Sequence, residues 1–150
     1  MESDDIARFI AALGGVDVVV ASAATGAPEV SWGDSFFFYN PDRLESARQF
    51  PFATIVTKDY AAFDTASNLN RPGVYRLNIG LARETYADLF SGHNRKYDFA
   101  AVDQLLPHPV YGPNHWVCVL NPSDATFERL KPLLAEAHGR AVQRYRPTSD

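Results

Sequence analysis

The sequence is poor in cysteine, and it lacks both a long apolar run and a basic amino terminus. Cys118 is the only cysteine among 150 residues, so a disulfide within the chain is excluded and a reducing compartment is favoured. No stretch approaches the ~18 apolar residues that indicate a membrane span. Residues 1–5 carry acidic side chains, whereas a signal peptide begins with basic ones. We therefore expect a soluble, cytoplasmic protein with no membrane partner.

Positive charge is also scarce. The formal net charge is -4 and the pI is near 5.5, so the chain lacks the broad positive field that usually drives nucleic-acid binding. A local basic patch would have to replace that field, either at residues 93–96 or at Arg140, Arg144 and Arg146. The three late arginines equally suit the negative end of a terminal helix. Nucleic acid is therefore disfavoured as a partner.

Motifs for metals, cofactors and covalent chemistry are missing. The four histidines, His93, His108, His115 and His138, show neither the i, i+4 helical pair nor the repeated Cys/His spacing of a metal site. There is no glycine-rich phosphate loop and no nucleophile elbow. Cys118 lies within an apolar run, which is typical of a buried, inert thiol. We expect no metal and no cofactor.

The chain contains no spacer rich in serine, glycine or charge, so residues 1–150 are expected to form one domain. Ser3 has the character of an N-cap for a first helix that ends before Gly14. Strands are predicted where β-branched, aromatic or alternating segments lie between turn residues, over residues 16–22, 35–39, 52–57, 73–80 and 115–120. A short helix is predicted over residues 83–90. A terminal helix follows residues 121–123, with a kink or restart at Pro132.

This order of elements predicts an α+β fold. Few β-α-β crossovers are available, so an antiparallel sheet with helices packed on one face is favoured over a doubly wound sheet. Within residues 73–80, Arg76 and Asn78 share a polar or wet face of the strand. An arginine fixed on a strand can hold a carboxylate or a phosphate. The alternatives are a solvated face or a structural ion pair with Asp59 or Asp64.

Four consecutive aromatic residues occupy positions 36–39 and must place rings on both faces of their strand. Such a strand is covered on both faces by the core, or one face lines a dimer interface or a ligand pocket. A homodimer is therefore among the expectations. The polar segment of residues 58–72 is either a lid or ordinary surface.

Three segments carry a family resemblance: RPGVYRLNIG at residues 71–80, LPHPVYG at residues 106–112 and WVCVLNP at residues 116–122. Together with residues 36–39 and 50–57, they resemble a bacterial family of uncharacterised proteins over most of the chain. That family implies no activity. More remotely, the element order, with Trp116 near a strand start, resembles the YjbR/MmcQ-like superfamily, which implies a small α+β fold sometimes described as DNA-binding.

These features converge on one candidate ligand-binding site, a partly aromatic concavity formed by Arg76, Asn78, His108, Tyr111, His115 and Trp116. A concave apolar surface with a few polar groups is typical of a ligand pocket. We therefore expect a non-catalytic module that binds a small molecule or a protein partner. The alternatives are a YjbR-like nucleic-acid-binding protein and a small enzyme that uses His108 or His115 as a general base.

Overall fold

The computed structural model of the chain describes residues 1–91 and 96–146. The α-helices in these residues are α1 (Ser3–Ala11), α2 (Arg83–Phe90) and α3 (Asp124–Arg144), and the strands are β1 (Val16–Val20), β2 (Ser35–Tyr39), β3 (Ala53–Val56), β4 (Arg76–Gly80), β5 (Leu106–Pro107) and β6 (Trp116–Leu120). None of these helices combines the length and the apolar character needed to cross a membrane. The amino-terminal part of the basic segment at residues 93–96 lies outside the described residues.

The strands form one six-stranded sheet in the order β1-β2-β3-β4-β6-β5, and all neighbours are antiparallel. The predicted α+β fold is thus confirmed. The register aligns Phe36, Thr54, Asn78 and Cys118 in one row across four strands. Because side chains alternate along a strand, this row lies on the face opposite to the core residues that flank it in each strand.

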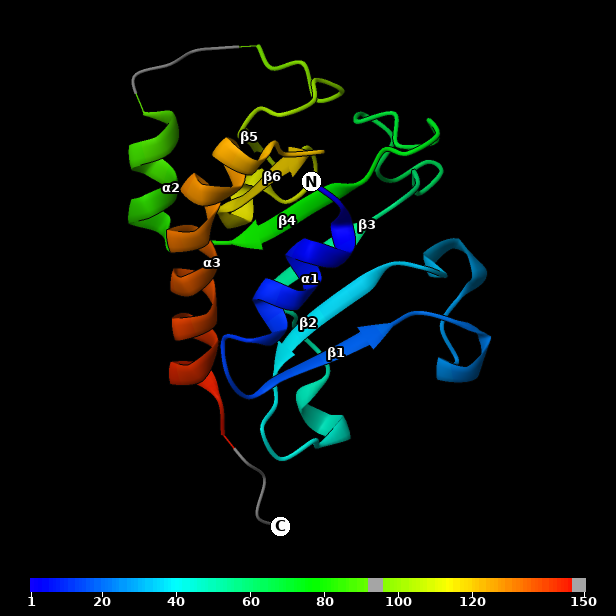
Figure 1. Cartoon of the computed structure of the whole chain (residues 1–150), viewed down its shortest axis with the longest axis vertical. Coiled ribbons are helices and arrows are strands. Elements are labelled where there is room, and N and C mark those ends of the chain that lie inside the picture. Colours follow the sequence, from blue (N-terminus) through cyan, green and yellow to red (C-terminus); the bar gives the residue numbers. More distant parts are fainter. Residues whose placement is uncertain (92–95, 147–150) are drawn as a thin grey trace.

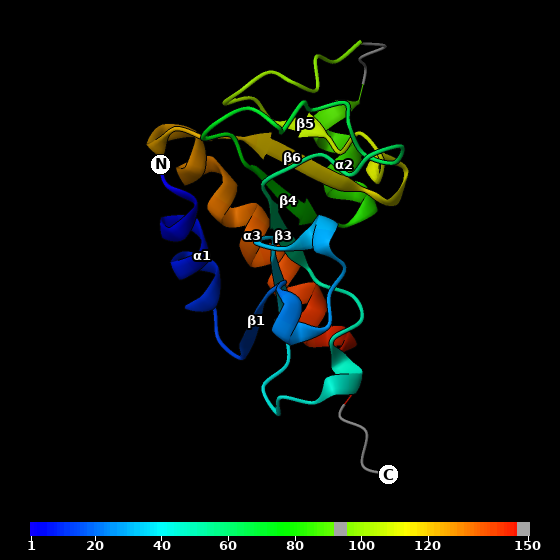
Figure 2. The same cartoon turned by 90° about the vertical axis from the view of Figure 1, so that its right-hand side faces the viewer.

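Helices α1 and α3 lie side by side against one face of the sheet (Figures 1 and 2). The ring of Phe9 in α1 meets the ring of Phe127 in α3 edge-on, at 5.5 Å between centroids. Between helices and sheet lies a core that includes Ile6, Ile10, Phe37, Leu77, Ile79, Val117, Val119, Leu130 and Leu134. Burial of each such side chain contributes about 1.5–3 kcal/mol. Most of the hydrophobic stability therefore comes from this face, and a smaller cluster of Val56, Leu69 and Leu120 lies on the other.

The other face of the sheet is covered by irregular chain. Asp64, from the connection between β3 and β4, and His108, from the segment before β6, both reach Arg76 on β4. All five residues of β4 are buried, and Arg76 is only 1% exposed. The polar face that the sequence predicted to be wet is therefore buried, because loops cover it where helices do not.

Several boundaries differ from the sequence predictions, since β1 ends at Val20 and β3 spans only Ala53–Val56. Ser3 is the first residue of α1 and not its N-cap, a position that Glu2 occupies without a side-chain hydrogen bond. β4 begins at Arg76, three residues later than expected, since residues 71–74 form a turn. His115 has a left-handed φ of 70° at the end of a 3-10 turn, so β6 begins after it.

Helix α3 runs without interruption from residue 124 to residue 144 and does not restart at Pro132. Proline inside a helix removes one backbone hydrogen bond and crowds the carbonyl of the preceding turn. Pro132 and Glu128, whose carbonyl loses its donor, both lie on the exposed side of the helix, where water can replace that donor. The hydroxyl of Ser123 caps the amino end by accepting from the backbone N–H of Thr126 at 3.2 Å.

Candidate functional site

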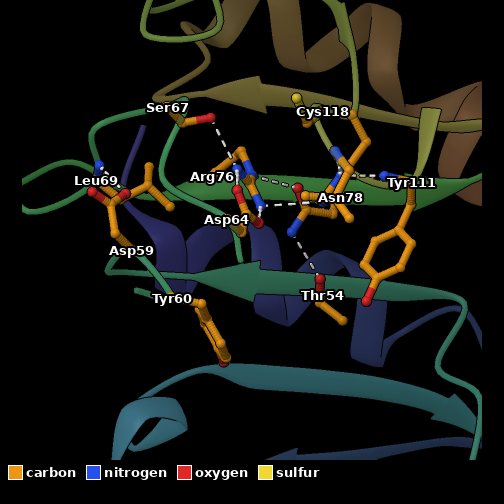
Figure 3. Close-up of polar contacts among 12 residues, drawn as sticks. Thr54, Asp59, Tyr60, Asp64, Ser67, Leu69, Arg76, Asn78, Tyr111 and Cys118 are labelled. Atoms are coloured by element: carbon orange, nitrogen blue, oxygen red, sulfur yellow. Dashed lines mark hydrogen bonds and ion pairs between the residues drawn. The ribbon is translucent and has the colours of Figure 1, made fainter. Parts of the chain in front are cut away.

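Arg76 is the centre of a buried polar network on the loop-covered face of the sheet (Figure 3). Its guanidinium donates to both carboxylate oxygens of Asp64, at 3.1 and 2.5 Å. It also donates to the side chains of Asn78 at 2.8 Å and Ser67 at 2.9 Å. The structural ion pair with Asp64 is thus confirmed, and the solvated face is wrong. Such a bidentate pair fixes the guanidinium in one orientation.

The connection between β3 and β4 is held by its own hydrogen bonds, which place Asp64 over the sheet. The carboxylate of Asp59 accepts from the backbone N–H of Leu69 at 2.8 Å. Asp59 therefore stabilises the loop and does not pair with Arg76. The hydroxyl of Tyr60 donates to Asp34 at 2.5 Å. Burial, followed by this hydrogen bond, raises the pKa of Tyr60 well above its usual range, so its hydroxyl remains a donor at physiological pH.

The ring of His108 is held against the same site by contacts at both of its nitrogens. Its Nδ1 accepts from the backbone N–H groups of Val110 and Tyr111, at 3.0 and 2.9 Å. Its Nε2 lies 3.1 Å from Nη2 of Arg76, so both ring nitrogens are occupied by partners within the protein. Burial, and then the charge of Arg76, lowers the pKa of His108 to about 3. His108 is therefore neutral at pH 7 and a weak general base.

Asn78 continues the polar row toward β3. Its Nδ2 donates to the hydroxyl of Thr54 at 2.9 Å, and its second amide hydrogen has no acceptor among the described residues, which leaves it for a ligand. Next in the row, Cys118 is fully buried and contacts the backbone oxygen of Pro107 at 3.7 Å. Burial raises the pKa of the Cys118 thiol to about 12, so it is protonated at pH 7. The prediction that the Cys118 thiol is buried is confirmed.

A cavity of about 700 Å³ lies against this polar row. Its walls are predominantly aromatic and aliphatic. The lining residues are Phe36, Phe50, Pro51, Phe52, Thr54, Val56, Tyr60, Phe63, Asp64, Arg76, Asn78, Gly80, His108, Tyr111, Trp116, Arg140 and Arg144. Phe36 thus turns its ring to the cavity while its neighbour Phe37 enters the core.

Five of the six predicted site residues line this cavity, namely Arg76, Asn78, His108, Tyr111 and Trp116. The sixth, His115, lies at a shallower, neighbouring depression, where its ring is 5.7 Å from that of Tyr86. His115 differs because its left-handed backbone turns the chain just before the start of β6.

Trp116 forms one wall of the cavity by lying over Gly80, the last residue of β4. A Cβ atom at position 80 would stand 2.9 Å from Cε2 of the indole, closer than side-chain carbons normally approach. The backbone of Gly80 is therefore the surface on which the ring rests. Among the described residues, the indole N–H of Trp116 has no acceptor, so it too is available to a ligand.

Substitution of Gly80 by alanine is expected to push the Trp116 ring into the cavity. Overpacking of this kind costs about 1 kcal/mol when the neighbour can move into open space. We expect a lowered melting temperature and an altered environment of the Trp116 indole, measured by thermal denaturation and by NMR. Gly139→Ala is the matched control, because a Cβ at that position meets no atom within 4 Å. Equal behaviour of the two variants would contradict the packing described.

The sequence analysis did not predict that arginines of the terminal helix would reach the cavity beside Arg76. Arg140 and Arg144 line the cavity, whereas Arg146 donates to the backbone oxygens of Gln143 and Tyr145, at 2.9 and 2.8 Å. Arg146 therefore donates to carbonyls at the helix end, and Arg144 also lies in the last turn of α3. The i, i+4 spacing of Arg140 and Arg144 is the signal that places both on one side of a helix.

Among residues 1–91 and 96–146, no group of three or more His, Cys, Asp or Glu side chains is arranged to hold a metal ion. A family model described as a family of unknown function (DUF6194) matches the chain over residues 1–150. A search of curated proteins finds no match.

Proposed function

We propose that this chain, which belongs to the family of unknown function DUF6194, is a binding module whose cavity accepts a small organic molecule. The observation that carries the proposal is the cavity of about 700 Å³, which joins aromatic walls to a short row of polar groups. Ligand pockets typically enclose about 300–1,000 Å³ and are lined by apolar side chains with a few oriented polar groups. We take the chain to act as one cytoplasmic domain.

The ionisable groups of the cavity favour binding over turnover. His108 has a pKa of about 3, which is too low for a general base near neutral pH. Arg76 is matched in charge by Asp64, and its donors are already engaged. A fixed network of this kind can orient a ligand but has no group poised to take up or release a proton.

The proposal is tested by a thermal-shift screen of small organic molecules, followed by NMR of the two tryptophan indoles. A ligand that binds only the native state at 100 times its Kd stabilises the protein by about 2.7 kcal/mol. Trp116 lines the cavity, whereas the indole of Trp32 donates to the backbone oxygen of Ala27 at 2.9 Å and lies outside it. We expect a hit to shift the Trp116 indole signal and to leave that of Trp32 in place.

Assignment of the two indole signals follows from Trp116→Phe and Trp32→Phe, each of which removes one of them. Arg76→Ala is unsuitable as a probe of the site, because it leaves Asp64 buried without its cation. Hits that raise the melting temperature without moving the Trp116 signal bind elsewhere, and a screen that gives only such hits refutes the proposal.

A further inference from the structure

We propose that the ligand of this cavity is an elongated organic anion, a carboxylate or a phosphate monoester, whose charged group lies between Arg140 and Arg144. The inference rests on the proposed binding function and adds the charge and the direction of the ligand. The two ends of the cavity differ in net charge, and this difference determines the orientation of the bound ligand.

The outer end of the cavity carries unmatched positive charge. Neither Arg140 nor Arg144 forms an ion pair or a hydrogen bond among the described residues, although both line the cavity. Desolvation, and then the charge of Arg140, lowers the pKa of Arg144. Two guanidinium groups one helical turn apart repel each other, and an anion between them relieves this repulsion.

The inner end of the cavity is electrically neutral. Arg76 and Asp64 cancel, and His108 carries no charge at pH 7. An anion placed here would be buried without a counterion, at a cost of several kcal/mol. The second amide hydrogen of Asn78 has no acceptor among the described residues and remains open as a donor. This end therefore suits a neutral oxygen acceptor, such as a carbonyl or an ether.

The neutral end and the positively charged end of the cavity lie at opposite ends of β4. Glu136, one turn before Arg140, accepts from the backbone N–H of Ala82 at 3.0 Å, so the arginines approach the Gly80 end of the strand. Figure 1 shows the arrowhead of β4 directed at α3. From Arg76 to Gly80 the strand advances about 13 Å at a rise of ~3.3 Å per residue. An apolar body spanning this length lies along the Trp116 wall.

The test compares three probes that share one aromatic body: phenylbutyrate, phenylbutyl phosphate and phenylbutanol. Dissociation constants are measured by titration of the Trp116 indole signal. We expect both anions to bind at least tenfold more tightly than the alcohol. In Arg140→Gln/Arg144→Gln this advantage disappears, so that the two anions bind that variant no more tightly than the alcohol does. A preference between carboxylate and phosphate identifies the source of the anionic group.

The matched control is Arg8→Gln/Arg129→Gln, which removes the same charge from exposed positions outside the cavity. Equal affinity for all three probes, or an anion preference that survives in Arg140→Gln/Arg144→Gln, overturns the assignment of the anion and leaves the binding function standing. Failure of every probe to move the Trp116 signal overturns both. A loss of anion affinity in the control as large as in the cavity variant also overturns the assignment, because it reports overall charge.

Discussion

Replacement of Asp64 by alanine is expected to lower the free energy of unfolding by about 3–5 kcal/mol. The side chains of Asp64 and Arg76 are 9% and 1% exposed, and they share two hydrogen bonds. Removal of the carboxylate leaves the guanidinium buried without a counterion, and this uncompensated charge causes most of the loss. Urea denaturation at pH 7, followed by circular dichroism, measures the change.

Two further variants separate the ion pair from the mere loss of a side chain. Asp88→Ala removes an exposed carboxylate and is expected to change stability by no more than about 0.5 kcal/mol. Asp64→Leu/Arg76→Met removes both charges, and because a buried pair is often replaceable by apolar side chains, it is expected to be more stable than Asp64→Ala. A double variant no more stable than Asp64→Ala would show that the buried charge is not the cause.

Acidification from pH 7.5 to pH 5 is expected to reduce the stability contributed by His108 by about 2 kcal/mol. The folded pKa of about 3 lies below the ordinary value of 6.5. Between these values the unfolded chain binds more protons than the folded chain. The contribution is therefore complete above pH 6.5 and is lost progressively as the pH falls toward 3. Urea denaturation at a series of pH values measures it.

His108→Asn is the matched variant for this pH dependence. The Asn side-chain oxygen can accept the backbone N–H groups of Val110 and Tyr111 in place of Nδ1, but it does not titrate. We expect its stability to be flatter than that of the wild type over this range, although lower at pH 7.5. Asp17 contributes little here, because its pKa is held below 3.8 by Arg48, Asn40 and Arg43 in spite of burial. Parallel pH profiles for variant and wild type would be evidence against the protonation argument.

Local patterns were sufficient for most elements of the fold. β2 and α2 match their predicted bounds, because a run of aromatic residues and a short helical segment are delimited by turn residues close in sequence. The cap at Ser3 and the restart at Pro132 were misjudged for the opposite reason. Whether a serine caps a helix depends on its backbone angles, and whether a proline ends one depends on which side faces solvent.

The predictions about binding partners remain predictions. The net charge of -4 still disfavours nucleic acid, and a homodimer remains a prediction. Phe50 and Phe63, at the rim of the cavity, are 81% and 56% exposed. Exposed rings of this size are compatible with a ligand or a second chain that covers them.

The sequence by itself determined the α+β class, the polar row on β4 and the burial of Cys118, because alternation and apolar runs are local properties. Only the tertiary structure decided that Asp64 neutralises Arg76 and that Arg140 and Arg144 reach the same cavity. These residues lie far apart in the chain. Their pairing depends on the antiparallel register of the sheet and on the path of α3, and no local pattern encodes either.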